Sequence, residues 1–214
     1  MEHKAFIFDL DGTLLNTLED LKNSVNFAMR SMGYPEHTLE QVRMFIGNGI
    51  AMLIKRAVPQ GTDEIDEKKT LGIFTEHYNA HLNDCTAPYP GVTESLTVLK
   101  NRGVKIGVVT NKNDDSAKML IAGYFGNLVD VTLGHLDGIP SKPNPEALLR
   151  VMSDLGVNSE ETLYFGDSDV DVLTAKNAGV KSVGASWGFR GEDVLLKAGA
   201  DIILSDPNKI ADLK

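Results

Sequence analysis

Two aspartates, Asp9 and Asp11, are the earliest residues in the chain whose types and spacing could do chemistry. They directly follow an apolar run at residues 5–8 that is typical of a buried strand. Because residues two apart on an extended backbone project to the same side, both carboxylates are expected to enter one site. A hard divalent cation would relieve their repulsion, and Mg²⁺ suits a site with few protein carboxylates and room for phosphate oxygens. The sequence therefore predicts a magnesium site.

Polar side chains also follow other apolar runs of the chain. Asp167 and Asp171 come after the run at residues 163–165, and Lys142 precedes a predicted helix. Ligands of a doubly wound sheet bind at the carboxyl ends of its strands, so these side chains are expected to converge with the first two aspartates. Asp167 would supply a third carboxylate oxygen to the metal, and Lys142 would neutralise both substrate and nucleophile.

The same region offers groups that could hold a phosphate. Gly12 and Thr13 follow the aspartates at a turn, where the lack of a Cβ lets main-chain N–H groups approach an anion. Thr110 and Asn111 follow the run at residues 104–109 and can donate hydrogen bonds from the next strand. Taken singly, each motif is more often a turn or a cap, but their ordered combination favours a functional site.

Short apolar runs rich in Val, Ile and Phe alternate with helix-like segments over most of the chain. Such runs are typical of parallel strands buried on both faces by helices. The alternation predicts an α/β fold with a doubly wound, Rossmann-like parallel sheet. The expected strands are residues 5–8, 104–109, 129–133, 163–165 and 181–184, with 201–204 as a further candidate.

The alternation stops between residues 17 and 88, where the apolar spacing is helical. Thr17 is expected to begin a helix that ends near residue 32, with Asp20 completing a capping box. Thr38 and Gln41 repeat the cap signal before a second helical stretch, and a longer helix is expected at residues 65–82.

We therefore expect two domains. Residues 1–15 and 89–214 would form the α/β core, and residues 16–88 would form an inserted four-helix cap. Both linkers lie near the loop after the first strand, which suits a hinged lid. Asn144 and Pro145 are expected at the cap position and the first position of a core helix that begins just after Lys142.

The overall composition excludes several classes of protein. The chain has 214 residues, 42% hydrophobic and 24% charged, which is the balance of a folded globular protein. Its net charge of −9 argues against nucleic acid or an anionic membrane as partner. One cysteine, Cys85, and a short apolar run after the N-terminus predict a cytoplasmic protein without an internal disulfide or a signal peptide.

The chain resembles the haloacid dehalogenase superfamily of phosphatases, and within it the phosphoglycolate phosphatase branch, over almost its whole length. Residues 109–112 and 45–49 resemble segments of that branch, and the helical insertion resembles the family's helical cap. Asn16 stands where many relatives carry an aspartate, outside the reacting groups. Four motifs occur in family order: Asp-x-Asp-Gly-Thr at residues 9–13, Thr110, Lys142, and the acidic pair Asp167 and Asp171.

The resemblance implies a covalent mechanism. Asp9 would attack phosphorus to form an aspartyl-phosphate, which divides one difficult hydrolysis into two displacements. Asp11 would protonate the leaving alkoxide and then deprotonate the attacking water.

The same resemblance implies the metal ligands and the phosphate clamp. Asp9, the main-chain oxygen of Asp11, and Asp167 would bind Mg²⁺, while Asp171 would hold a metal-bound water or Lys142. Asp169 is interpreted as an acid favoured by the helix dipole. The clamp would be completed by Lys142, Thr110 and Asn111.

The substrate is expected to be a small phosphorylated metabolite, bound by a monomer or a homodimer. Phosphoglycolate leads on resemblance, and inorganic pyrophosphate, nucleoside monophosphates and sugar phosphates are alternatives. In the cap, Gly47 and Gly49 would let a loop carrying Asn48 bend over the site. The cap also carries three basic residues, Arg43, Lys55 and Arg56. They are interpreted either as contacts to substrate or as solvated groups beside a helix–helix turn.

Three other functions are alternatives to a phosphatase. A hydrolytic dehalogenase needs neither a metal nor a second aspartate, so Asp11 and Asp167 count against it. A sugar phosphomutase would use the same residues, and the lid would decide whether water or a sugar hydroxyl accepts the phosphoryl group. A signalling receiver domain, a binding module and not an enzyme, is disfavoured by the long insertion and by the Asp9 and Asp11 pair.

Overall fold

The computed structural model describes residues 3–214 and contains a six-stranded sheet in which all neighbouring strands pair in parallel. Residues 1 and 2, the start of the expected core segment, lie outside the described residues. The order across the sheet is β5-β4-β1-β6-β7-β8, so the predicted α/β parallel fold is confirmed. The strands are β1 Ala5–Phe8, β4 Lys105–Asn113, β5 Val131–His135, β6 Thr162–Gly166, β7 Lys181–Ala185 and β8 Ile202–Leu204.

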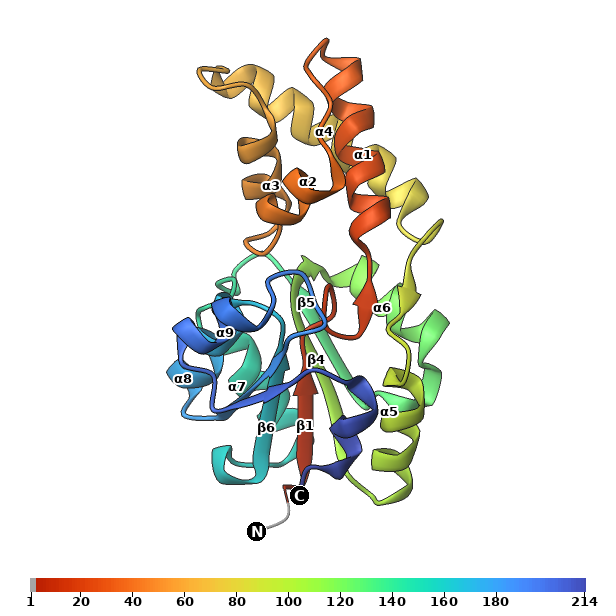
Figure 1. Cartoon of the computed structure of the whole chain (residues 1–214), viewed down its shortest axis with the longest axis vertical. Helices are drawn as coiled ribbons and strands as arrows, with labels where there is room; N and C mark the ends of the chain where they lie inside the picture. The colour runs from red at the N-terminus through yellow and green to blue at the C-terminus, as the bar shows by residue number, and fades with distance from the viewer. Residues whose placement is uncertain (1–2) are drawn as a thin grey trace. The chain divides into compact units, whose positions relative to one another are not determined.

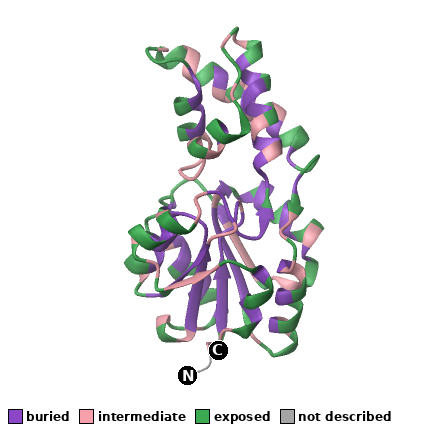
Figure 2. Ribbon diagram, viewed as in Figure 1, coloured by how far each residue is buried: buried purple, intermediate pink, exposed green. Residues whose placement is uncertain are grey.

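Helices cover both faces of this sheet. Helices α7 (Glu146–Leu155) and α8 (Asp169–Ala178) lie on one side, and α5 (Val92–Asn101) and α6 (Asp114–Tyr124) lie on the other (Figure 1). The central strands are therefore buried, and all four residues of β1 are inaccessible to solvent (Figure 2). This explains why their sequences are continuous apolar runs with no alternation of polar residues. Helix α9 (Glu192–Ala198) lies between β7 and β8 in the chain.

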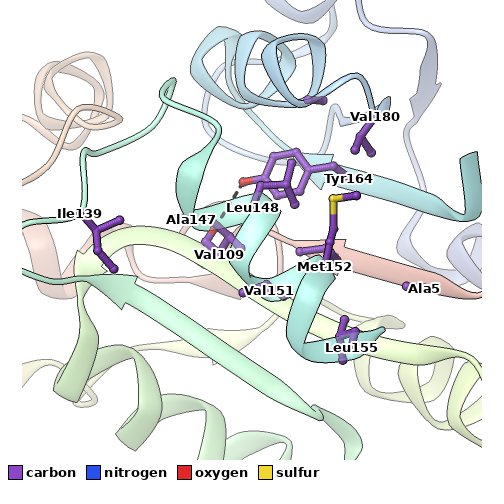
Figure 3. Close-up of a cluster of buried hydrophobic side chains, with 12 residues drawn as sticks. Ala5, Val109, Ile139, Ala147, Leu148, Val151, Met152, Leu155, Tyr164 and Val180 are labelled. Atoms are coloured by element: carbon purple, nitrogen blue, oxygen red, sulfur yellow. Dashed lines mark hydrogen bonds between the residues drawn. The ribbon is translucent and has the colours of Figure 1, made fainter. Parts of the chain in front are cut away.

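One face of the sheet is filled by an apolar cluster between α7, β1, β4 and β6 (Figure 3). Leu148, Val151 and Met152 of α7 are at most 5% exposed in this cluster. Gly107 of β4 allows the helix to pack closely, because a Cβ there would lie 2.7 Å from Val151. Tyr164 lies in the same cluster but carries a hydroxyl group, which must find polar partners.

The chain divides into two compact units, one up to Asn16 together with Pro88–Lys214 and the other Thr17–Ala87. The second unit contains four helices among its described residues: α1 Leu18–Ser31, α2 Leu39–Phe45, α3 Ile50–Ala57 and α4 Glu64–His81. Short strands β2 (Leu15–Asn16) and β3 (Ala87–Pro88) pair at the chain segments that join the units. None of the helices in the described chain is long and apolar enough to cross a membrane.

Two of the expected helix starts are wrong in detail. Helix α1 begins after Thr17 as expected, but no capping box forms, because Asp20 accepts hydrogen bonds from the distant Thr86 instead. Helix α7 begins at Glu146, with Pro145 at its N-cap, so Asn144 lies one residue further out. The Asn144 side chain still accepts from the Glu146 N–H at 2.9 Å. By contrast, the capping box of Thr38 and Gln41 is present at α2.

Candidate active site

The predicted site residues of the core come from the carboxyl ends of three neighbouring strands. Asp9 follows β1, Thr110 lies in the C-terminal half of β4, and Asp167 follows β6. Because β4, β1 and β6 are adjacent and parallel, their ends lie at one edge of the sheet. The first aspartate is fixed further by its own main chain, whose N–H donates to the Phe165 carbonyl at 2.8 Å.

Lys142 lies at the centre of this group. Its side chain is 3% exposed, and its Nζ lies 2.9 Å from Asp9 Oδ1 and 2.6 Å from Asp171 Oδ1. A third contact, at 3.1 Å, reaches the hydroxyl of Tyr164. Burial alone would lower the pKa of Lys142, but the two carboxylates raise it well above its usual value, so the ammonium stays charged.

The main chain of Lys142 is held by a predicted substrate-binding residue. Asn111 accepts a hydrogen bond from the Lys142 N–H at 2.9 Å and donates one to its carbonyl at 3.3 Å. This reciprocal pair fixes the loop between β5 and α7 to the end of β4. The amide of Asn111 therefore positions the lysine, a contact that the sequence did not predict.

Three aspartates form a cluster that could hold a metal ion. One carboxylate oxygen from each of Asp9, Asp167 and Asp171 lies within 4.8 Å of the other two. Burial raises the pKa of Asp9 to about 7, with Lys142 opposing the shift and Asp171 adding to it. Burial also raises the pKa of Asp167 well above its usual value, and the neighbouring carboxylates add to that shift. The raised pKa values show that the negative charges of Asp9 and Asp167 are not fully balanced by nearby positive charge.

A hard divalent cation fits this arrangement. The donors are all oxygen atoms, which Mg²⁺ prefers. Counting Asp11 and its partner Lys112, four carboxylates face two lysines, and full ionisation would leave two negative charges uncompensated. The two carboxyls with the raised pKa values, Asp9 and Asp167, are the ones that a cation would most stabilise in their charged form.

Asp171 differs from the other two because its oxygens are already engaged. Its Oδ1 pairs with Lys142, and its Oδ2 accepts from the Ser168 hydroxyl at 2.5 Å and from the Ser168 N–H at 3.2 Å. A Cβ on Gly166 would overlap the Asp171 side chain at 2.1 Å, which explains the glycine before the loop. This geometry suits a residue that orients Lys142.

Asp167 is held by the segment after β7. The N–H of Phe189 donates to Asp167 Oδ2 at 2.6 Å, and the indole N–H of Trp187 donates to the Thr13 carbonyl at 3.0 Å. Gly12 has a φ of +83°, and a Cβ there would lie 2.3 Å from Asp167 Oδ2. A glycine is therefore required at this turn for both backbone conformation and space. The Thr13 hydroxyl is buried without a hydrogen-bond partner among the described residues.

Asp11 points to a different partner from Asp9, although the two were expected to enter one metal site. Both of its carboxylate oxygens contact Lys112 Nζ, at 3.1 and 3.2 Å. The Asp11 side chain is therefore not part of the three-aspartate cluster within the described chain. Thr110, two residues before Lys112, is 5% exposed and accepts a hydrogen bond from the Lys112 N–H at 3.2 Å.

In the helical unit, the predicted loop residues form their own local contacts. Gly47 and Gly49 have positive φ angles, +121° and +81°, which favour glycine. Asn48 Oδ1 accepts from Arg56 at 2.8 Å, and the same guanidinium donates to the Phe45 carbonyl at 2.7 Å. Arg56 therefore braces the loop. Of the other two basic candidates, Arg43 pairs with Glu40 at 3.5 Å and Lys55 is exposed.

Several residues of the site escaped sequence reasoning. The sequence assigns no separate role to Lys112, which lies in the segment 109–112 that resembles the phosphoglycolate phosphatase branch, or to Tyr164, which lies in the apolar run at residues 163–165. It likewise assigns no separate role to Ser168, which caps α8 and donates its hydroxyl hydrogen to Asp171. The Trp187 and Phe189 contacts had no motif to announce them, since one is an indole and the other a main-chain N–H.

The chain is similar to known proteins in both sequence and structure. The chain matches a family model described as haloacid dehalogenase-like hydrolase over residues 6–185. The phosphoglycolate phosphatase of Pseudomonas fluorescens (strain Pf0-1) is 34% identical over 218 residues, covering 97% of this chain and 78% of that protein. The phosphoglycolate phosphatase of Vibrio parahaemolyticus is 37% identical over 221 residues, covering 98% and 92%. The crystal structure of a predicted phosphoglycolate phosphatase from Haemophilus somnus superposes with a TM-score of 0.92 at 29% identity, covering 99% and 98% of the two chains.

Proposed function

This chain belongs to the haloacid dehalogenase-like hydrolase family and is a phosphatase, and we propose that it hydrolyses a small phosphate monoester through an aspartyl-phosphate on Asp9. The observation that carries the proposal is the contact of one buried lysine, Lys142, with both Asp9 and Asp171 beside a third buried aspartate. A receiver-like binding module is disfavoured by the family match to hydrolases.

Asp9 is suited to be the nucleophile. Its Oδ1 is held by Lys142 at 2.9 Å and by the Leu10 N–H at 2.7 Å. Within the described chain, its Oδ2 carries no such hydrogen bond, so this oxygen can attack phosphorus. Attack transfers the phosphoryl group to the carboxylate and releases the alkoxide; water then attacks the phosphorus, which breaks its bond to Asp9 and releases inorganic phosphate.

The remaining core residues have separate tasks in this proposal. Asp11 gives a proton to the leaving alkoxide and later takes one from the attacking water. Lys142 offsets the negative charge of nucleophile and substrate. The phosphate is bound by the Thr110 hydroxyl and by groups of the turn at Gly12 and Thr13, with Asn111 holding Lys142 in place.

Asp9, Asp167 and the main-chain oxygen of Asp11 would hold Mg²⁺, with Asp171 supporting them from the Lys142 side. Once bound, Mg²⁺ supplies positive charge to the transferring phosphoryl group and aligns it with the nucleophile. The raised pKa values of Asp9 and Asp167 support this assignment.

Phosphoglycolate is the leading substrate, because relatives that are 34% and 37% identical carry that name. Pyrophosphate, nucleoside monophosphates and sugar phosphates are the alternatives, and a phosphomutase would need the same core residues. We propose that residues 16–88 act as a lid over the core formed by 1–15 and 89–214, with Gly47 and Asn48 in the loop that contacts substrate. The protein would act in the cytoplasm as a monomer or homodimer, without nucleic acid or membrane as partner.

A phosphate-release screen of these substrates, with and without Mg²⁺, tests the proposal. Asp9→Asn should lower turnover by about 10³-fold or more, because the amide is a poor nucleophile. Asp169→Asn is the matched control, since Asp169 is an exposed aspartate at the start of α8, after the neighbouring strand β6.

Two results would contradict the mechanism. Full activity in Asp9→Asn would exclude the covalent step, and Mg²⁺-independent turnover would exclude the metal. Release of free phosphate without a bisphosphate activator would exclude the mutase alternative.

A further inference from the structure

The core site contains a second buried lysine that the proposed mechanism does not use. The side chain of Lys112 is 4% exposed, and its Nζ contacts both carboxylate oxygens of Asp11, at 3.1 and 3.2 Å. Its main-chain N–H donates to the Thr110 hydroxyl at 3.2 Å. One residue therefore joins the second aspartate of the first motif to the hydroxyl of the second motif.

This placement follows from an irregularity in β4. The pairing of β4 with β5 shifts register between Val109 and Asn113, at the segment that contains Lys112. Such irregularities redirect side chains and are common beside active sites. Along an extended segment, Thr110 and Lys112 project to the same side, and both are at most 7% exposed, while Asn111 between them is partly exposed.

A buried lysine is expensive to desolvate, and an apolar side chain of similar size would usually stabilise a core at least as well. Lys142 already balances Asp9 and Asp171, so Lys112 is not needed for those carboxylates. Its contact with both oxygens of Asp11 restricts the rotation of that carboxylate. The cost of burying Lys112 is thus understandable if the orientation of Asp11 matters for turnover.

We infer that Lys112 is a positioning residue, which holds the Asp11 carboxylate in the orientation needed for proton transfer to the leaving group. This inference deepens the proposed function and rests on the acid role of Asp11. Misplacing a reacting group by about 1 Å can cost roughly 10²-fold in rate. A direct role of Lys112 in binding the substrate phosphate is the competing explanation, and the two make different predictions.

The test measures how kcat/KM depends on the leaving group. A series of aryl phosphates, from phenyl phosphate to 4-nitrophenyl phosphate, spans leaving groups that need protonation strongly or hardly at all. Lys112→Met should lower kcat/KM by about 10- to 100-fold for phenyl phosphate and by less than about threefold for 4-nitrophenyl phosphate. Lys112→Arg, which keeps the charge, should restore part of the loss. The slope against leaving-group pKa does not depend on the fraction of folded enzyme.

Asp11→Asn and the double variant complete a cycle. If Lys112 acts through Asp11, adding Lys112→Met to Asp11→Asn should leave the slope unchanged and cost less than about threefold. Lys118→Met is the matched control, because Lys118 is an exposed lysine of α6 that pairs with Asp114 at 2.6 Å, and the variant should keep the slope of the wild type.

Equal losses for all leaving groups in Lys112→Met, or a full extra loss in the double variant, would overturn the inference and assign Lys112 to phosphate binding or folding. A normal slope in Asp11→Asn itself would instead contradict the acid role of Asp11 in the proposed function. The two failures are therefore distinguishable.

Discussion

The α/β core contains a group of buried ion pairs, whereas the described ion pairs of the helical unit lie at its surface. In the core, Lys142, Asp9 and Asp171 are buried and contact one another. In the helical unit, ion pairs such as Lys22 with Glu19 lie at the surface within one turn of helix. Assembling charges inside a protein gives little net stability over an apolar core, whereas surface pairs cost little to form. The difference indicates that the core has kept a costly arrangement for chemistry.

The largest expected effect sharpens this comparison. Lys142→Met leaves Asp9 and Asp171 buried without their cation and should lower the free energy of unfolding by roughly 3–5 kcal/mol. Lys22→Met removes the cation of a partly exposed pair in α1 and should cost at most about 0.5 kcal/mol. Urea unfolding of the two variants measures both values. Similar losses in the two variants would contradict the contrast between the units.

One charged residue of the helical unit is buried and is therefore an exception to this contrast. Asp20 is 2% exposed and accepts hydrogen bonds from the Cys85 N–H at 2.9 Å and from the N–H and hydroxyl of Thr86 at 2.8 and 2.7 Å. It thus ties the start of α1 to the segment that leaves the unit, with main-chain and hydroxyl donors in place of a lysine. A buried charge here serves structure.

Asp20→Ala should therefore destabilise the helical unit by about 2–3 kcal/mol, because several buried donors lose their acceptor. Asp84→Ala is the control, since Asp84 is exposed and its carboxylate pairs with His81 at 2.8 Å within one turn of chain. Hydrogen exchange should show faster opening at α1 and at residues 85–86 with little change in β1 and β6. Faster exchange of the core strands to the same degree would show that the two units do not unfold separately.

Charge burial in the core also predicts how metal binding depends on pH. Burial raises the Asp9 pKa to about 7, so below that pH the metal-free protein carries a proton that Mg²⁺ must displace. The apparent dissociation constant for Mg²⁺ should therefore rise as the pH falls below 7, by about tenfold per pH unit for each ligand carboxyl that must lose a proton. Asp9→Asn should bind more weakly and with a smaller pH dependence.

The sign of the stability effect follows from the same shift. A carboxyl whose folded pKa exceeds its unfolded value of about 3.9 favours folding most at low pH, and this contribution is lost as pH rises to about 7. Saturating Mg²⁺ should reverse the loss, which thermal unfolding between pH 5 and 8 would detect. A Mg²⁺ affinity that does not change between pH 5.5 and 7 would contradict the assignment of Asp9 as a ligand.

The positions of the core site residues were predictable because parallel strands end at one edge of a sheet. Apolar runs located β1, β4 and β6, and the polar residues that follow them had to converge. The strand ends were less accurate, since β4 continues to Asn113 and β5 begins two residues later than expected. Local periodicity does not record where the pairing of two strands stops.

Contacts between distant residues could not be read from local patterns. Asp20 has the spacing of a capping residue, but its carboxylate instead accepts hydrogen bonds from donors 65 and 66 residues later. Lys112 reaches Asp11 across 101 residues, at a place where the register of β4 shifts. In each case the partner is chosen by the folded geometry, and sequence spacing carries no information about it.

The smallest expected effect compares two buried tyrosines. Tyr164 in β6 places its hydroxyl 3.1 Å from Lys142 Nζ and 3.2 Å from Asp171 Oδ1. The same hydroxyl donates to the Val109 carbonyl at 3.2 Å (Figure 3). Tyr78 in α4 is 4% exposed and stacks on Phe74 in the helical unit. Substitution by phenylalanine deletes the same hydroxyl in both regions and should cost about 1 kcal/mol of stability in each.

Only the core substitution should alter turnover. In Tyr164→Phe, Lys142 keeps its contacts with Asp9 and Asp171 but loses the hydroxyl that accepts its third hydrogen bond. We expect kcat to fall by about three- to tenfold, corresponding to about 1 kcal/mol in the transition state, with KM nearly unchanged. Tyr78→Phe should retain the wild-type kcat. If Tyr164→Phe is less stable but turns over normally, the hydroxyl serves only the Val109 carbonyl, and Lys142 is held in place by its two carboxylates alone.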